Sequence, residues 1–393
     1  HEPARGGGDR PAGAAVARAG AGTADARCRP EIVAGVVVGP SGLGWVDIDL
    51  PIQIVALLGL AFLLFLAGLE IDVHKLRGSV LGTALVGDVV TLALGVGAGA
   101  AFHAAGWVTS ALLVAVTLSA TSLGLVVPVL KDAGQLDGAL GQTTVAACSV
   151  ADFGAVVLLS LLFSTSESST GSRVILLVMF AVVVIVTGVV VSVAGRSQRL
   201  GMALLRLQDT TAEIRVRAAV VLLVAFVALA EKFGLESILG AFLAGAVVAL
   251  VDRDSASHPN FRVKLEAIGY GFVIPVFFVT SGLRLDLGGL VKAPGSLLRV
   301  PIFLVALLVV RGVPALLLAR SFPRSAVFAA ALLQATSLPF IVTATQIGVL
   351  TGRMSEVTAA AMICAGLLSV VVFPAAALTL LRRSEPAREV VAR

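Results

Sequence analysis

The stretch Gly141–Ser164, GQTTVAACSVADFGAVVLLSLLFS, places one carboxylate, Asp152, near the middle of an apolar segment long enough to cross a membrane. An acid at the centre of a spanning helix costs about 2.5 to 3.5 kcal/mol on insertion scales, so such residues usually face a cavity and handle ions or protons. The alternative is an acid paired with a buried base purely for helix packing. The stretch therefore predicts a transmembrane helix that carries a functional carboxylate.

The composition of the whole chain also requires a membrane. Its 393 residues are 58% hydrophobic and 13% charged, which leaves too little polar surface to coat a water-soluble protein of this size. Apolar runs such as Ala218–Ala230 do not alternate in polarity, so we expect helices in a lipid bilayer rather than barrel strands. The three cysteines and four histidines are scattered, which argues against a resident metal, a cofactor or an enzymatic centre.

Apolar segments from Glu31 onward predict an all-α polytopic membrane protein with about twelve transmembrane helices. The segments are 31–48, 51–71, 79–103, 109–130, 139–164, 173–194, 218–231, 236–251, 265–283, 297–319, 325–350 and 355–381. Many of them are long enough for a hydrocarbon layer of about 30 Å. Residues 1–30, rich in Gly, Ala, Arg and Pro, hold no sustained apolar run, and we expect them to be disordered or non-native.

The positions of Lys and Arg predict the orientation of the chain. Most of the basic residues fall in alternate loops and in the tail, among them Lys131, Arg320, Arg324 and Arg382. Because cytoplasmic loops carry the excess of Lys and Arg, we expect the C-terminus, with the tail 382–393, in the cytoplasm and the protein in the plasma (inner) membrane. Orientation also explains the net charge of +5 more simply than nucleic-acid binding does.

Two short motifs occur twice in the chain. LAGLEID at Leu66–Asp72 is similar to TSGLRLD at Thr280–Asp286, and ATSL at Ala120–Leu123 recurs at Ala335–Leu338. The helices that carry each pair run in opposite directions in the predicted topology, which is the inverted repeat that many secondary transporters use to build a site at mid-membrane. The expected transmembrane domain, 31–381, thus consists of repeats at about 31–164 and 236–381 joined by 165–235.

Both copies of ATSL lie where a helix is expected to unwind. Gly124 and Pro128 follow the first copy, and Pro339 follows the second. Unwinding would free backbone carbonyls for a cation at mid-depth, whereas the alternative is that the small polar residues only permit close helix packing. The candidate cation ligands are Thr121, Ser122, Ser149 and Asp152, with Thr336 and Ser337 supporting them from the second break.

Several separate motifs together resemble a known family. They are RPEIVAGVVVGPSGLG (29–44), LLFLAGLEID (63–72), SVADFGAVVLLSLLF (149–163), LGAFLAGAVV (239–248), GFVIPVFFVTSGL (271–283) and VVRGVPALLL (309–318). In this order they resemble the bacterial monovalent cation:proton antiporters, the family of sodium/proton and potassium-efflux antiporters. The resemblance covers about Pro30–Leu381.

The resemblance implies a thirteen-helix fold with two crossed broken helices in a core domain, and a panel through which two protomers form a homodimer. The first of the thirteen helices looks missing here. The chain also ends soon after its last apolar segment, so regulation by a nucleotide-binding domain, as in some relatives, would need a separate subunit.

The resemblance also implies roles for individual residues. By its place in VADF, Asp152 is the acid that carries the ion or proton, and Ala151 departs from the Asp or Asn of better-known sodium/proton members. Arg311, in the middle of the tenth segment, is the expected counter-charge to Asp152. Asp88, about a third of the way into its helix, is expected to be either structural or interfacial, or a second titrating group.

Three functions are compatible with these features. The first is a secondary antiporter that exchanges protons for transported Na⁺ or K⁺, electroneutral because one carboxylate binds either ion. The second is a sodium-coupled symporter for an organic anion, and the third is a non-transporting membrane sensor. The sequence has no GxxxxGK[ST] loop, which disfavours an ATP-driven pump.

Overall fold

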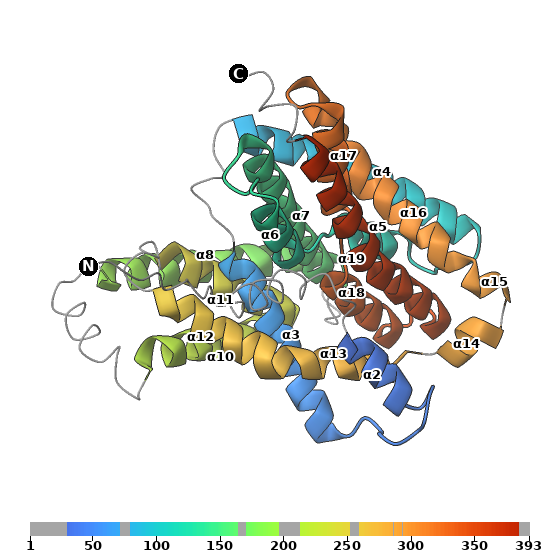
Figure 1. Ribbon diagram of the computed structural model, residues 1–393. Helices are drawn as coiled ribbons and strands as arrows, with labels where there is room; N and C mark the ends of the chain where they lie inside the picture. Colours follow the sequence, from blue (N-terminus) through green and yellow to red (C-terminus); the bar gives the residue numbers. More distant parts are fainter. Residues whose placement is uncertain are drawn as a thin grey trace, which may run out of the picture.

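The computed structural model describes residues 30–70, 79–163, 170–195, 213–251, 259–285, 287–292 and 294–384 (Figure 1). All regular secondary structure within these ranges is helical, which confirms the predicted fold class. The expectations for residues 1–29 and for the tail beyond Ser384 lie outside the described residues. The helices are α2 (Pro30–Val38), α3 (Leu50–Leu69), α4 (Ser79–Ala104), α5 (Ala111–Ser119), α6 (Leu123–Asp132), α7 (Ala139–Phe163), α8 (Thr170–Gly195), α10 (Ile214–Lys232), α11 (Ser237–Val251), α12 (Pro259–Ile268), η1 (Gly269–Val273), α13 (Ile274–Leu283), α14 (Leu287–Lys292), α15 (Pro294–Leu297), α16 (Arg299–Gly312), η2 (Val313–Arg320), α17 (Arg324–Gln334), α18 (Pro339–Leu350) and α19 (Glu356–Ser384).

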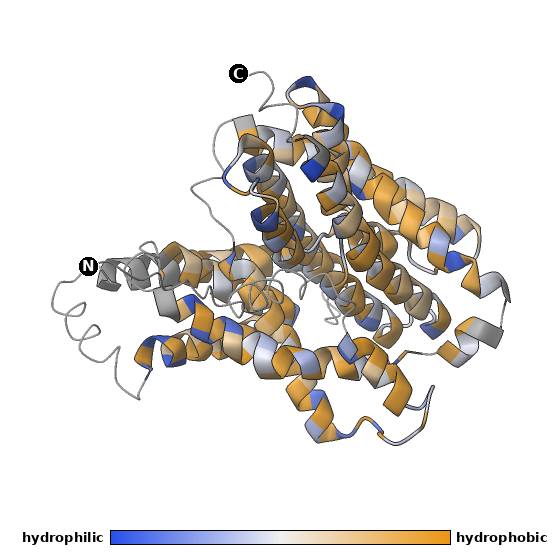
Figure 2. Ribbon diagram, in the orientation of Figure 1, coloured by the Kyte–Doolittle hydropathy of each residue, from blue (hydrophilic) through white to orange (hydrophobic). Residues whose placement is uncertain are grey.

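Hydrophobic residues dominate these helices (Figure 2). In the described part of the chain, eight stretches are long and apolar enough to cross a membrane, and two shorter apolar helices lie at Val174–Val186 and Ser237–Leu250. Every predicted segment contains at least one helix, while the number of twelve complete spans stays a prediction. The first segment, 31–48, is helical only as far as Val38 and then turns at Gly39–Leu43.

The helices form two groups. One group, here called the core, consists of α4–α7 and α16–α19, which pack mainly on one another. The other, here called the panel, consists of α2, α3, α8 and α10–α13 with η1, and its closest pairs are α3 with α11 and α2 with α13. In Figure 1 the two groups lie on different sides of the molecule. They meet where α3 approaches α6 and where α11 and α8 approach α7.

Glycines allow the backbones of the panel helices to touch. A Cβ atom on Gly68 of α3 would lie 2.0 Å from the Phe242 carbonyl oxygen of α11, and one on Gly245 of α11 would lie 1.9 Å from the Phe65 carbonyl oxygen of α3. Helices in lipid gain little from hydrophobic contact with each other, so small residues that permit close packing supply much of the attraction. The reciprocal pair Gly68 and Gly245 therefore fixes how α3 crosses α11.

The core contains the two predicted broken helices. The first span stops at Ser119 and restarts at Leu123, and the second stops at Gln334 and restarts at Pro339. Each interruption leaves backbone groups without helical partners, and Pro339 cannot donate the amide hydrogen that would continue α17. Non-helical backbone at membrane depth is tolerated only where protein or a cavity surrounds it. Ala120, Thr121, Thr336 and Ser337 are buried accordingly.

The contact between α3 and α11 leads to a prediction for Gly245→Ala. The added methyl group would meet the Phe65 carbonyl oxygen, and overpacking of this kind costs about 1 to 3 kcal/mol. We expect a lower melting temperature for the purified protein in detergent. Gly97→Ala in α4 is the matched control, because nothing lies within 4 Å of the Cβ position at Gly97. Equal melting of the Gly245 variant and the control would show that the two helices do not pack as described.

Candidate functional site

The two helix breaks touch each other in the middle of the core. The Thr121 hydroxyl in the first break donates a hydrogen bond to the Thr336 carbonyl oxygen in the second, over 3.1 Å. The same hydroxyl lies 3.9 Å from the Cys148 thiol of α7. Both threonines are at most 2% exposed, so the hydrogen bond between them is shielded from solvent. The two ATSL motifs, 215 residues apart, are thus brought together.

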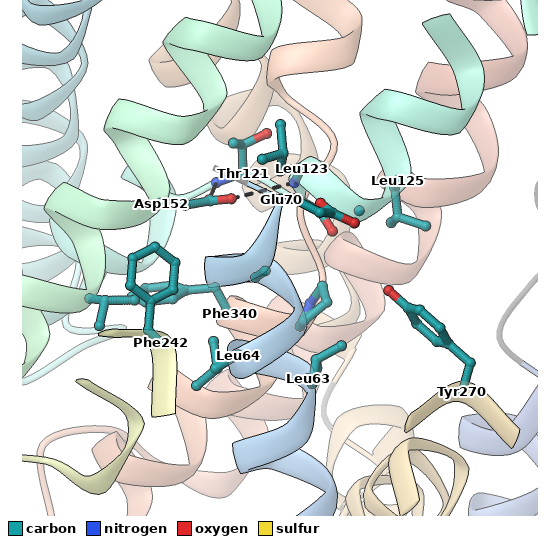
Figure 3. Close-up of a pocket in the computed structure, with 15 residues that line it drawn as sticks. Leu63, Leu64, Glu70, Thr121, Leu123, Leu125, Asp152, Phe242, Tyr270 and Phe340 are labelled. Atoms are coloured by element: carbon teal, nitrogen blue, oxygen red, sulfur yellow. Dashed lines mark hydrogen bonds between the residues drawn. The ribbon is translucent and has the colours of Figure 1, made fainter. Parts of the chain in front are cut away.

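Asp152 of α7 lies at the start of α6. Its Oδ1 accepts a hydrogen bond from the Thr121 amide over 3.0 Å, and its Oδ2 accepts one from the Leu123 amide over 3.4 Å (Figure 3). The first amides of a helix lack helical partners and carry the positive end of the helix dipole. A carboxylate held by such amides forms charge-assisted hydrogen bonds. The first break therefore supplies the partners that a charge in an apolar helix needs.

A cavity of about 40 Å³ opens beside Asp152, between core and panel. A water molecule requires at least about 10 to 15 Å³ measured in this way, so the space holds a few water molecules or a largely dehydrated ion. The lining residues are Leu63, Leu64, Ala67, Glu70, Thr121, Ser122, Leu123, Gly124, Leu125, Asp152, Val156, Phe242, Tyr270, Pro339 and Phe340. Among the predicted site residues, Asp152, Thr121 and Ser122 are in this set.

Glu70 is a site residue that the sequence analysis missed. It follows the last residue of α3 and lines the same cavity as Asp152, and its Oε2 atom is buried without a hydrogen-bond partner. Figure 3 shows its carboxylate close to the start of α6. Glu70 lies in LAGLEID, a motif that indicates the repeat and the family resemblance but does not by itself mark a site residue. The signal for Glu70 in the sequence is an acid at the end of an apolar segment.

Tyr270 lines the cavity from the panel side, across from Asp152. It lies in η1, a π-helical turn, just before Pro275 of α13. Pro275 has no amide hydrogen to continue a regular helix, and π-helical turns are frequent at functional sites. A Cβ atom on Gly124 would lie 3.3 Å from the Tyr270 hydroxyl and 3.4 Å from Glu70 Oε1. The absence of a side chain at Gly124 thus leaves room for both groups at the start of α6.

Arg311 lies in the core near the end of α16, where it is 2% exposed. Its Nε donates to the Gln334 carbonyl oxygen and its Nη1 to the Thr91 hydroxyl, each over 3.3 Å. No ion pair joins this guanidinium to Asp152, although both residues are described. Arg311 thus binds the last residue of α17, the helix that leads into the second break. Its role as counter-charge to Asp152 stays a prediction.

The other predicted residues lie apart from the cavity of Asp152. The Ser149 hydroxyl donates to a carbonyl oxygen one turn earlier in α7, and the Thr336 hydroxyl, in the second break, donates to a carbonyl oxygen of α17. The Ser337 amide donates to the Ser369 hydroxyl of α19. Asp88 lines a different cavity, together with Arg311. Of the predicted cation ligands other than Asp152, only Thr121 and Ser122 line the cavity beside it.

Comparison with known proteins supports a common fold and family. The family model described as "Sodium/hydrogen exchanger, transmembrane" matches residues 30–382. The "Putative Na(+)/H(+) antiporter YjbQ" of Bacillus subtilis is 31% identical over 376 residues, and the "Na(+)/H(+)-K(+) antiporter GerN" of Bacillus cereus is 28% identical over 267 residues. The solved structure of the sodium proton antiporter MjNhaP1 from Methanocaldococcus jannaschii matches with a TM-score of 0.59 at 17% identity.

These matches differ in how much of each protein they cover. The match to YjbQ includes 91% of this chain but 59% of the relative, and the match to GerN includes 66% of this chain and 65% of the relative. The chain therefore spans less than two thirds of the length of these two relatives. The structural match covers 91% of this chain and 92% of MjNhaP1, so the fold is shared along nearly the whole length.

The hydrogen bond between the two breaks predicts the effect of Thr121→Val. Valine keeps the shape of the side chain but leaves the buried Thr336 carbonyl oxygen without its donor, and an unsatisfied buried acceptor costs about 1 to 3 kcal/mol. We expect a lower melting temperature in detergent, with Thr121→Ser close to the wild type because serine retains the hydroxyl. If the valine and serine variants have the same melting temperature, the hydrogen bond does not link the breaks.

Proposed function

The chain belongs to the sodium/hydrogen exchanger family, and from this we propose that it is a secondary antiporter that exchanges protons for a monovalent cation, Na⁺ or K⁺. The observation that carries the proposal is the position of Asp152. Its carboxylate lies at a helix break, is held by two backbone amides, and lines a cavity. A carboxylate in this setting binds either a proton or a cation, and the two compete for it.

The breaks also supply neutral oxygen ligands for the cation. Thr121 and Ser122 line the cavity beside Asp152, and an unwound backbone presents carbonyl oxygens of the kind that coordinate alkali ions. Na⁺ and K⁺ use the same ligand atoms, and the number of ligands and the cavity size select between them. The similarity to a protein named as a Na(+)/H(+)-K(+) antiporter supports keeping both ions in the proposal.

Alternating access follows from the division into core and panel. The cavity lies between them, with Asp152 on the core side and Glu70, Phe242 and Tyr270 on the panel side. Movement of the core against the panel would carry the breaks and the bound ion from one side of the membrane to the other. In this scheme the panel is the stationary part, and we propose that it forms the contact in a homodimer.

We further propose that the protein lies in the plasma membrane with its C-terminus in the cytoplasm. The segments that carry Lys131, Arg324 and Arg382 meet in one buried cluster that contains Leu130, Ala326 and Leu381. Basic residues gathered at one end of the helices mark the cytoplasmic side.

The charge of the cavity disfavours a symporter for an organic anion. Two carboxylates, from Glu70 and Asp152, line the space beside the breaks, and no Lys or Arg is in the lining set. The lining thus offers acid oxygens that accept a proton or a cation and no basic group that would pair with an organic anion. A sensor without transport differs from the proposal in one measurable respect, which is the flux of ions.

The test of the proposal is a pH-gradient assay in everted membrane vesicles, with Na⁺, K⁺ and Li⁺ added in turn and no organic solute present. Antiport predicts that at least one of the cations alone dissipates an imposed proton gradient. A gradient that collapses only when an organic anion is added would replace antiport by symport. Cation binding to the purified protein without any flux would identify a sensor.

Asp152→Asn should abolish cation-dependent proton flux. Asparagine keeps the size of the side chain, but its amide can neither release a proton nor neutralise a cation. The variant should still insert into the membrane, which its amount in purified membranes will show. Asp47→Asn, a change of the same kind at an exposed position, is the control and should retain flux. Flux at the wild-type rate in the Asp152 variant would remove Asp152 from the site.

Exchange should be electroneutral, because Asp152 is the carboxylate that the amides of the break hold, and one group that binds either H⁺ or a monovalent cation exchanges them one for one. Ala151 has no ionisable group, and a guanidinium balances charge without releasing a proton. A K⁺ diffusion potential imposed with valinomycin on proteoliposomes should therefore leave the rate of Na⁺/H⁺ exchange unchanged. A rate that changes several-fold with the sign of the potential would require a second carrier. Glu70→Gln would then be the variant to measure, because Glu70 shares the cavity.

A further inference from the structure

The guanidinium of Arg311 is a buried charge with incomplete hydrogen bonding. Its Nε and Nη1 atoms each have one partner, but its Nη2 atom is buried and has none. A charge removed from water is stable only when it is paired and its donors are satisfied. Arg311 therefore requires a further partner, and no ion pair in the described structure supplies one.

Asp88 is the acid best placed to be this further partner of Arg311. It lies on α4 three residues before Thr91, which accepts from Arg311, so both residues share one helix face. Asp88 and Arg311 line the same cavity of about 20 Å³, together with Gln334 and Thr143. This volume exceeds the roughly 10 to 15 Å³ that one water molecule needs. The cavity also offers such a water a donor in Arg311 and an acceptor in Asp88.

We propose that Asp88 is the counter-charge of Arg311, joined to it through one water molecule in this cavity, and that the pair holds the end of α17 in place. The charge pair itself does not depend on the function proposed above. Only its effect on transport rests on that function. The carboxylate of Asp88 excludes an anion from the cavity, and the guanidinium excludes a cation. Water is the ligand that satisfies both groups.

The pair acts on the second break through Gln334. Gln334 is the last residue of α17, and its carbonyl oxygen accepts from Arg311. A cation near the C-terminal end of a helix stabilises the carbonyls that have lost their helical donors. Asp88 neutralises the charge of this guanidinium from the other side of the cavity. It is a positioning residue, because its effect reaches the break only through Arg311.

Asp88 lies away from the transport cavity. A Cβ atom on Gly154 of α7 would lie 3.2 Å from Asp88 Oδ2, so the carboxylate packs against α7 at Gly154. Gly154 and Asp152 are two residues apart, which places them on nearly opposite faces of a helix. Asp88 does not line the cavity of Asp152. In this arrangement Asp88 reaches the transport site through Arg311 and not as a lining residue of its cavity.

A double-mutant cycle in melting temperature tests the pair. The variants are Asp88→Asn, Arg311→Gln and the double variant, purified as the full chain in detergent. Each single change leaves one buried charge without its partner, and we expect each to lower the melting temperature by about 5 °C or more. The double variant should melt no lower than the less stable single variant, because it leaves neither charge unpaired. Losses that simply add would overturn the proposal.

Conservative variants and controls complete the cycle. Asp88→Glu keeps the negative charge and should restore most of the melting temperature that Asp88→Asn loses, whereas failure to do so would contradict a charge pair. Asp49→Asn, at an exposed helix cap, should have no effect, because asparagine caps a helix as well as aspartate does. If the single variants yield no folded protein, folded protein from the double variant supports the pair. A double variant that also fails to fold overturns the proposal.

Transport measurements separate this role from that of a proton carrier. Asp88→Asn vesicles should keep the wild-type pH of half-maximal exchange and the wild-type Na⁺ concentration for half-maximal rate, whatever the change in maximal rate. A shift of either value would place Asp88 in the ion path and overturn the proposal. If the wild-type protein exchanges no ions, the antiporter proposal fails, while the melting cycle still decides whether Asp88 and Arg311 form a pair.

Discussion

The hydrogen bonds between Asp152 and the amides that begin α6 are the interaction on which the rest of the core depends. A carboxylate inside an apolar helix is costly, and unpaired amides at membrane depth are costly too. Each of these groups removes the other's cost, since the amides of Thr121 and Leu123 donate to the two oxygens of Asp152. The break and the acid are therefore one structural unit, and neither would be stable alone.

The second break is stabilised by a different set of groups. Arg311 donates to the carbonyl oxygen at the end of α17, and the Ser337 amide before α18 donates to the Ser369 hydroxyl. A negative side chain thus lies at the start of one half-helix and a positive one at the end of another, as the directions of the helix dipoles require. The Thr121 hydroxyl joins the two breaks, so the position of one break constrains that of the other.

Close packing by glycine positions the panel relative to this centre. Gly68 and Gly245 bring α3 against α11, and Glu70 follows the end of α3 only two residues beyond Gly68. Gly124 then leaves space for the Glu70 carboxylate and the Tyr270 hydroxyl at the start of α6. The second carboxylate of the cavity is thus placed by backbone contacts between helices that are distant in the sequence.

The sequence by itself determined the helical membrane fold, the two breaks and the isolated position of Asp152 in an apolar helix. These features depend on local causes, namely the length of the apolar segments, the prolines and glycines that interrupt them, and the cost of an isolated acid in lipid. The tertiary structure alone decided that Glu70 lines the same cavity as Asp152, that Arg311 donates a hydrogen bond to Gln334, and that Asp88 lines a separate cavity. A helix that is apolar on all sides has no periodic pattern to indicate which face is inward. The rotation of each helix about its axis, and hence the direction of its few polar side chains, is set by packing against its neighbours.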